Sequence, residues 1–331
     1  MAGLDRWLAD DPLPFARGTV ADLVHPTAGL SNETVIVTLS SRTRVVVRLP
    51  PAVASFPDHD FLLQARVAEL AGSAGLPVPG PIVTEPDESF VGSPFLVMPF
   101  VDGDIPGPAS VFDRWLPEAS PEDQRPAQTA MLDPLAGRAA GDWAGWAVGA
   151  ELRGANSGLA DEVAWWRRFL DWAADGSPHP RFVAVLDWCA STCPTPSAPP
   201  SLVWGDPRLE NLIFDEHRRV LAVLDWELAT IGPAEMDLGW YLGLERILRQ
   251  MTGGMTVPGF RDDEQVVTDW SAAVGRPAED VEWHEIFAVA RSICINVRQA
   301  AISAAAGVDY LLPGDETNPL LGVVEGWISA A

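Results

Sequence analysis

Short runs of β-branched and other apolar residues dominate the first hundred residues and predict β-strands. Within 60–71, by contrast, apolar residues recur at three- and four-residue spacing, which predicts a helix that Asp58 or Asp60 can cap. We therefore expect an antiparallel sheet with one helix packed on it. The predicted strands are 18–24, 33–39, 43–49, 81–84 and 95–101.

The pattern changes beyond residue 101. Residues 104–126 are rich in proline and acidic side chains, which indicates a loop with short helical pieces. Residues 127–175 and 235–331 show helical periodicity over most of their length. The sequence thus predicts an α+β chain with two domains, 1–101 and 102–331.

Carboxylate and amide side chains stand at the ends of three short apolar runs in residues 201–226. Asp206 follows the first run, Asn211 precedes the second, and Asp225 ends the third. A β-hairpin in this block would place the three side chains at one edge. The predicted strands are 202–204, 212–214 and 220–224.

These oxygen-bearing side chains suit phosphoryl transfer. That reaction needs a carboxylate to orient or deprotonate a hydroxyl, together with oxygen ligands for Mg²⁺. The spacing from Asp206 to Asn211 matches the kinase catalytic loop, and Asp225 matches its later metal-binding aspartate. The plainer alternative is an acidic turn in which Asp206 or Asn211 caps local backbone.

Charge excludes several classes of protein. The chain has 46 acidic and 22 basic residues, a formal net charge of −24, and no lysine. A general binder of nucleic acid or anionic membrane needs a basic face, so we expect neither partner. Without lysine, Schiff-base chemistry and a Walker-type phosphate lysine are excluded. A solvated acidic surface explains the charge more simply than a cationic substrate does.

Cysteine and histidine give no sign of a disulfide framework or a zinc site. The three cysteines are an odd number in a long chain, and the five histidines are scattered. The N-terminus carries acids where a signal peptide has positive charge, and no apolar run reaches 18 residues. We expect a cytoplasmic protein.

Several segments together resemble the aminoglycoside phosphotransferase/choline kinase-like family. The strongest are Trp204–Asn211, which reads WGDPRLEN, and Val223–Gly232, which reads VLDWELATIG. This form is similar to the branch that is also found fused to some acyl-CoA dehydrogenases. Further resemblance lies in the phosphate-side loop, the third strand, the break after the helix and the hinge: Gly29–Asn32, Val45–Pro51, Gly75–Pro79 and Pro94–Gly103.

The resemblance implies a bilobal protein-kinase-like fold and an ATP- and Mg²⁺-dependent transfer of phosphate to a small-molecule hydroxyl. Residues 1–101 would be the nucleotide-binding N-lobe, and 102–331 the larger helical C-lobe with a catalytic β-hairpin and the substrate site. Asp206 would be the catalytic base, while Asn211 and Asp225 would hold Mg²⁺.

Nucleotide contacts follow from the same resemblance. Arg48 takes the place of the family's phosphate-contacting lysine. Ser31 and Asn32 lie in the phosphate-side loop, and the backbone around Met98 and Phe100 would bind adenine.

The resemblance leaves the roles of three further residues less sharply defined. Arg208 would contact an anionic group of the substrate or form a structural ion pair. Glu227 would support the site from behind the metal ligands, and Asp237 would fix the catalytic loop without touching substrate.

The sequence also departs from the family pattern. Trp204 stands where histidine is usual, Pro233 replaces an aspartate, and Gln64 stands where a glutamate would pair with the cation of the third strand. These departures keep open an alternative, a nucleotide-binding pseudokinase or binding module without turnover. A protein kinase is disfavoured, because no Asp-Phe-Gly or Ala-Pro-Glu segment is present. For an active enzyme, a hydroxyacyl metabolite is favoured over an aminoglycoside as acceptor.

Overall fold

The chain forms two compact units that are discontinuous in sequence. The computed structural model describes residues 2–26, 32–57, 60–107, 116, 118–137, 152, 158–308 and 310–331. Unit 1 comprises Met1–Asp104 and Leu212–Glu227, and unit 2 comprises Ile105–Asn211 and Leu228–Ala331.

Unit 1 is built on an antiparallel sheet with the strand order β1-β2-β3-β5-β4. In β2, Val35, Val37 and Leu39 are buried and alternate with more exposed positions, which is the pattern of a strand with one face in the core. The strands match the predicted runs to within about two residues. Their bounds are β1 Val20–Val24, β2 Glu33–Leu39, β3 Arg44–Leu49, β4 Val83–Glu85 and β5 Phe95–Pro99.

Helix α2 (Phe61–Ser73) covers one face of this sheet. Asp60 caps it, because its carboxylate accepts hydrogen bonds from the backbone N–H groups of Leu62 and Leu63. The buried residues of the helix–sheet contact are Phe61, Ala65, Leu96 and Met98.

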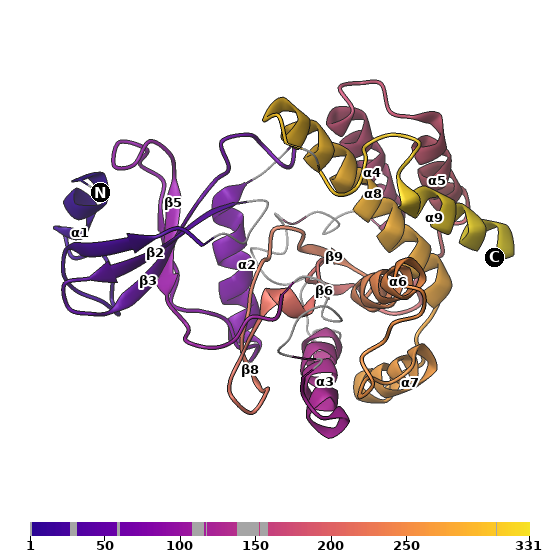
Figure 1. Ribbon diagram of the computed structural model, residues 1–331, viewed down its shortest axis with the longest axis horizontal. Helices are drawn as coiled ribbons and strands as arrows, with labels where there is room; N and C mark the ends of the chain where they lie inside the picture. Colours follow the sequence, from indigo (N-terminus) through magenta and orange to yellow (C-terminus); the bar gives the residue numbers. More distant parts are fainter. Residues whose placement is uncertain are drawn as a thin grey trace. The chain divides into compact units, whose positions relative to one another are not determined.

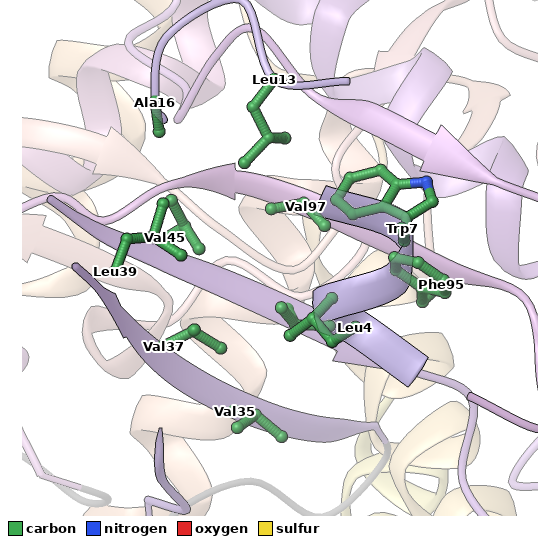
Figure 2. Packing of buried hydrophobic residues seen from close by; sticks show 11 residues of the cluster. Leu4, Trp7, Leu13, Ala16, Val35, Val37, Leu39, Val45, Phe95 and Val97 are labelled. Atoms are coloured by element: carbon green, nitrogen blue, oxygen red, sulfur yellow. The ribbon is translucent and has the colours of Figure 1, made fainter. Parts of the chain in front are cut away.

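A second helix, α1 (Ala2–Leu8), packs against the same sheet and corrects the prediction of a single helix. Its Leu4 and Trp7 lie among the inward-facing side chains of β2, β3 and β5 (Figure 2). These include Val97, whereas α2 contacts Leu96; successive strand residues point to opposite faces, so the two helices cover opposite faces. With only two buried side chains in seven residues, α1 is too short to show a period.

Unit 1 also contains the hairpin of β7 (Leu212–Phe214) and β8 (Val220–Val223). The prediction placed this segment with the helical domain. In the structure, Asp104 and Phe214 exchange two backbone hydrogen bonds of 2.9 and 2.8 Å. The N–H of Val223 donates to Pro77 at 2.7 Å. Backbone pairing therefore joins the hairpin to the N-terminal part of the chain.

Unit 2 is mainly helical, with α8 packed against α4, α5, α6 and α9 (Figure 1). Helices α6 and α8 approach closely at Gly239, where a Cβ atom would come within 2.5 Å of His284. Helix α3 begins at Pro121, inside the stretch expected to be mostly loop. The helices are α3 Pro121–Gly137, α4 Leu159–Ala173, α5 Pro180–Ser191, α6 Glu235–Met251, α7 Asp263–Val274, α8 Val281–Ala305 and α9 Pro319–Ala330.

A small antiparallel sheet in unit 2 pairs β6 (Ser201–Val203) with β9 (Thr230–Gly232). Strand β9 was not predicted, because its sequence Thr230-Ile231-Gly232 is not an apolar run like those at 202–204 and 212–214. Among the described residues, no helix is long and apolar enough to cross a membrane.

Candidate active site

The segment 204–211, which we call the Asp206 loop, follows β6 in unit 2. Its backbone is held by Asp237 of α6, whose two carboxylate oxygens each accept one hydrogen bond of 2.8 Å, from the N–H groups of Trp204 and Gly205. Asp237 is 2% exposed. A buried carboxylate that accepts two backbone donors fixes the start of the loop, as predicted for this residue.

Arg291 of α8 holds the same turn from the other side. Its guanidinium donates to the carbonyl oxygen of Gly205 at 2.7 Å and lies over the ring of Trp240 at 4.5 Å. Gly205 has a φ of +94°, and a Cβ there would come within 2.4 Å of the carbonyl oxygen of Leu228. Only glycine fits this turn. Because the backbone of Gly205 packs tightly against its surroundings, the position of the next residue, Asp206, is fixed as well.

The carboxylate of Asp206 is fixed by two neighbouring side chains. Nη2 of Arg208 donates a hydrogen bond of 2.8 Å to Oδ2, and its Nε lies 2.8 Å from Oδ1 as an ion-pair contact without hydrogen-bond alignment. The amide nitrogen of Asn211 donates to Oδ2 and to the backbone carbonyl of Asp206, both at 3.0 Å. The structure therefore brings together three of the predicted site residues, Asp206, Asn211 and Arg208.

Arg208 also reaches Glu210, with Nη1 3.1 Å from Oε1. Burial raises the pKa of Glu210, and the Arg208 charge opposes that shift. The guanidinium thus lies between two carboxylates of the loop.

In unit 1, Arg48 and Asp225 form an ion pair. Arg48 lies on β3, and its Nη2 is 3.8 Å from Oδ1 of Asp225, which comes two residues after β8. Asp225 has a φ of +57°, a left-handed conformation that aspartate adopts more readily than most residues. Arg48 therefore has a carboxylate partner, although Gln64 stands at the α2 position where a glutamate was expected.

A second polar pair in unit 1 joins Asn32 to Glu227. The amide nitrogen of Asn32, which directly precedes β2, donates to Oε2 of Glu227 at 2.9 Å. Ser31, its predicted companion in the phosphate-side loop, lies outside the described residues.

The proposed adenine segment lies at the end of β5. Met98 is buried against α2, and the backbone N–H of Phe100 donates to Arg44 at 3.3 Å. The guanidinium of Arg44 covers the Phe100 ring at 3.9 Å. Pairing of β5 with β4 extends only to Val97, so among the described strands the β4 side of the Met98–Phe100 backbone has no paired neighbour.

The three residues expected at one hairpin edge are divided between the two units: Asp206 and Asn211 belong to unit 2, and Asp225 to unit 1. That the three side chains lie together in one site stays a prediction. Within the described ranges, no three histidine, cysteine, aspartate or glutamate side chains gather closely enough to hold a metal ion.

The contribution of Arg291 was not recognised from the sequence. A signal was present, because Arg291 is the one charged residue in the apolar run 286–295. A buried cation in such a run needs an acceptor, here Gly205.

The fold is that of aminoglycoside phosphotransferases, which is protein-kinase-like. A Ralstonia eutropha protein described as a candidate aminoglycoside phosphotransferase has a TM-score of 0.78 and 23% identity, with 99% of this chain and 98% of that chain covered. A thermostable mutant of aminoglycoside phosphotransferase APH(4)-Ia, in a complex with ADP and hygromycin B, has a TM-score of 0.62 and 14% identity, with 99% of both chains covered. At these identities the likeness shows the fold.

The chain belongs to the phosphotransferase enzyme family, whose sequence profile matches residues 22–273. Acyl-CoA dehydrogenase family member 11 of Gallus gallus is 32% identical over 215 residues, which are 64% of this chain and 26% of that protein. The probable acyl-CoA dehydrogenase IBR3 of Arabidopsis thaliana is 25% identical over 329 residues, covering 91% of this chain and 39% of that protein. The chain therefore spans well under half the length of these relatives, and it resembles the branch predicted from its motifs.

Proposed function

We propose that this protein transfers the γ-phosphoryl group of ATP to a hydroxyl of a small molecule, with Mg²⁺. Membership of the phosphotransferase family supports the reaction class, and the ADP in the APH(4)-Ia structure supports an adenine nucleotide. The observation that carries the proposal is the fixed carboxylate of Asp206, held by Arg208 and Asn211 on a loop pinned by Asp237.

Asp206 is proposed as the catalytic base. An ionised carboxylate has about four lone-pair sites. Arg208 contacts both oxygens of Asp206, and Asn211 contacts one, which leaves accepting capacity for the hydroxyl of an acceptor. The carboxylate would orient that hydroxyl and take its proton as phosphate is transferred.

Asn211 and Asp225 are proposed to supply oxygen ligands for Mg²⁺. Asn211 donates its amide nitrogen to Asp206, so its side-chain carbonyl oxygen is the atom that can coordinate. One amide and one carboxylate suit Mg²⁺, which usually keeps waters and phosphate oxygens as its remaining ligands. When bound, the ion neutralises the charge of the phosphates and orients them.

Arg48 is proposed to contact the phosphates, with Ser31 and Asn32 in the adjoining loop. Held near Asp225 on a strand, Arg48 offers a planar guanidinium that matches phosphate geometry. Glu227 would orient Asn32 through their hydrogen bond. The β4 side of the Met98–Phe100 backbone would bind the adenine edge.

A hydroxyacyl metabolite is the acceptor that we favour. The relatives named as acyl-CoA dehydrogenases support this choice over an aminoglycoside. Arg208, whose side chain is 42% exposed, would repel a polycation and suits an acceptor with an anionic group.

The second candidate is a protein that binds nucleotide without turnover. Its support is Gln64, a buried amide at the α2 position where an active relative would carry a charge. Binding and transfer must therefore be measured separately.

Thermal unfolding with and without Mg·ATP tests nucleotide binding. At about a hundredfold excess over Kd, a ligand of the folded state adds about 2.7 kcal/mol of stability. We expect the midpoint to rise for the wild type and for Asp206→Asn, and to stay unchanged for Asp225→Ala. Asp187→Asn, on the exposed side of α5, is the matched control and should behave as wild type. No shift for the wild type would defeat the nucleotide site.

Phosphate transfer to a panel of hydroxyacyl compounds and aminoglycosides tests turnover. Asp206→Asn should abolish it while nucleotide binding remains, because the amide cannot take the proton. Retained turnover in Asp206→Asn would remove Asp206 from its role. Binding of Mg·ATP with no transfer to any acceptor would favour the second candidate.

A further inference from the structure

A pocket of about 200 Å³ lies beside the Asp206 loop, entirely within unit 2. One wall is formed by Pro207–Glu210, a second by the Tyr241–Met251 stretch of α6, and Met131 of α3 contributes to the lining. An apolar cavity of about 150 Å³ in another protein holds benzene, so this pocket has room for a chain of about six carbons. Pro207 directly follows Asp206, so the wall begins one residue from the proposed base.

Most of the lining is apolar. Met251 is 51% exposed, so the apolar surface continues to the outside of unit 2. Such a surface gains free energy when an apolar group covers it. The apolar lining residues are Met131, Pro207, Leu209, Leu244, Ile247, Leu248 and Met251.

Two polar side chains of the pocket, Tyr241 and Glu210, already have partners. The hydroxyl of Tyr241 accepts a hydrogen bond of 2.9 Å from Gln128, and Glu210 pairs with Arg208. Arg249, one turn beyond Glu245 on α6, pairs with Asp263 at the start of α7.

Glu245 is a second pocket carboxyl, besides Glu210, whose charge the surroundings oppose. Burial raises its pKa to about 7; the Arg249 charge acts against this shift, while the carboxylates of Asp263 and Glu210 add to it.

We propose that this pocket binds the uncharged apolar chain of the acceptor, with the hydroxyl-bearing end toward the Asp206 loop. The orientation of the hydroxyl rests on the proposed phosphotransfer, whereas binding of the chain does not. An apolar chain removes water from Glu245, which costs more when the carboxyl is ionised. Affinity for the chain should therefore fall as the pH rises through about 7.

Two matched probes test the pocket by calorimetric titration of the full chain: 1-hexanol, and 6-aminohexan-1-ol, whose amine stays charged below about pH 10. We expect hexanol to bind more tightly than the amine, and about tenfold more tightly at about pH 6 than at about pH 8.5. Glu245→Gln should bind hexanol equally at both pH values, because the amide does not titrate.

Leu248→Phe should abolish hexanol binding by filling the pocket, whereas Gln250→Phe, at an exposed position of the same helix, should leave it unchanged. If Leu248→Phe does not fold, Met251→Glu replaces it, because Met251 is half exposed and a charge is tolerated there. We expect Met251→Glu to weaken hexanol binding. Tighter binding of the amine, especially at the higher pH, would overturn the proposal in favour of a cationic ligand. Hexanol binding that survives both the Leu248 and Met251 changes would place the alcohol elsewhere and overturn it as well.

The Mg·ATP midpoint shift, measured on the same protein, separates this inference from the proposed function. Loss of hexanol binding with an intact nucleotide shift defeats the pocket alone. The reverse result defeats the nucleotide site and leaves the apolar pocket standing.

Discussion

The two halves of the candidate site are held in different ways. In unit 2, the Asp206 loop is fixed through its backbone by Asp237 and Arg291, which are 2% and 1% exposed. In unit 1, Arg48 and Asp225 contact each other through their side chains at 3.8 Å, with 17% and 24% of those side chains exposed.

This difference implies that one half of the site contributes mainly to folding stability and the other mainly to ligand binding. A buried donor that loses its partner costs about 1–3 kcal/mol. The Arg48–Asp225 pair is partly exposed and its charged atoms are 3.8 Å apart, so we expect it to contribute about 0–1 kcal/mol, as surface ion pairs do. Groups that fix the Asp206 loop should therefore be needed for folding, while Arg48 and Asp225 should be nearly neutral for folding and available to a ligand.

Asp237→Ala should have the largest effect on stability. It leaves the N–H groups of Trp204 and Gly205 without their carboxylate acceptor inside the packed unit, so the free energy of unfolding should fall by about 4 kcal/mol. Urea unfolding measures it. Asp237→Asn keeps one acceptor and should lose less, and Asp187→Ala should lose nothing measurable. A loss below about 1 kcal/mol for Asp237→Ala would remove the contrast between the two halves.

Acid sensitivity should also arise in unit 2, from His284 of α8. Burial lowers the pKa of His284 from 6.5 to about 4, with a smaller opposing effect of Glu235. The unfolded chain therefore binds a proton that the folded chain does not, and stability falls as the pH drops from about 6.5 to about 4. That interval corresponds to about 3 kcal/mol for this histidine.

His284→Gln should flatten this part of the pH–stability curve, measured by urea unfolding at several pH values. The comparison is between slopes, so a uniform loss of stability from repacking beside Gly239 does not disturb it. An unchanged slope would mean that His284 is not the group that responds to acid.

Local patterns in the sequence predicted most of the fold. Strand β2 was predicted at 33–39 and spans Glu33–Leu39, because Thr34–Thr38 is an unbroken run of β-branched residues. Strand β9 was not predicted, because its three residues become a strand only through pairing with β6. In that pairing, Ser201 of β6 lies opposite Gly232 of β9.

In the candidate site, too, the contacts between residues close in sequence were predictable and those between distant residues were not. The spacing of Asp206 and Asn211 was readable, since both stand on one short loop and contact each other there. The pair of Asn32 and Glu227 joins residues 195 positions apart, and such contacts depend on tertiary packing that one sequence does not reveal. Motif resemblance named both residues without predicting that they meet.

Arg48→Met should have the smallest effect on stability and the clearest effect on binding. The change keeps most of the apolar stem on β3 and removes an ion pair of 3.8 Å, so the free energy of unfolding should change by less than about 1 kcal/mol. The Mg·ATP midpoint shift should disappear, because no guanidinium remains for the phosphates.

A double-mutant cycle with Asp225→Asn sharpens this prediction. If Arg48 and Asp225 serve the ligand more than each other, their coupling in urea unfolding should stay near about 0.5 kcal/mol, and either change alone should remove the nucleotide response. A coupling above about 2 kcal/mol would show that the pair stabilises unit 1 as Asp237 stabilises unit 2, because such values are found for interactions largely withdrawn from water.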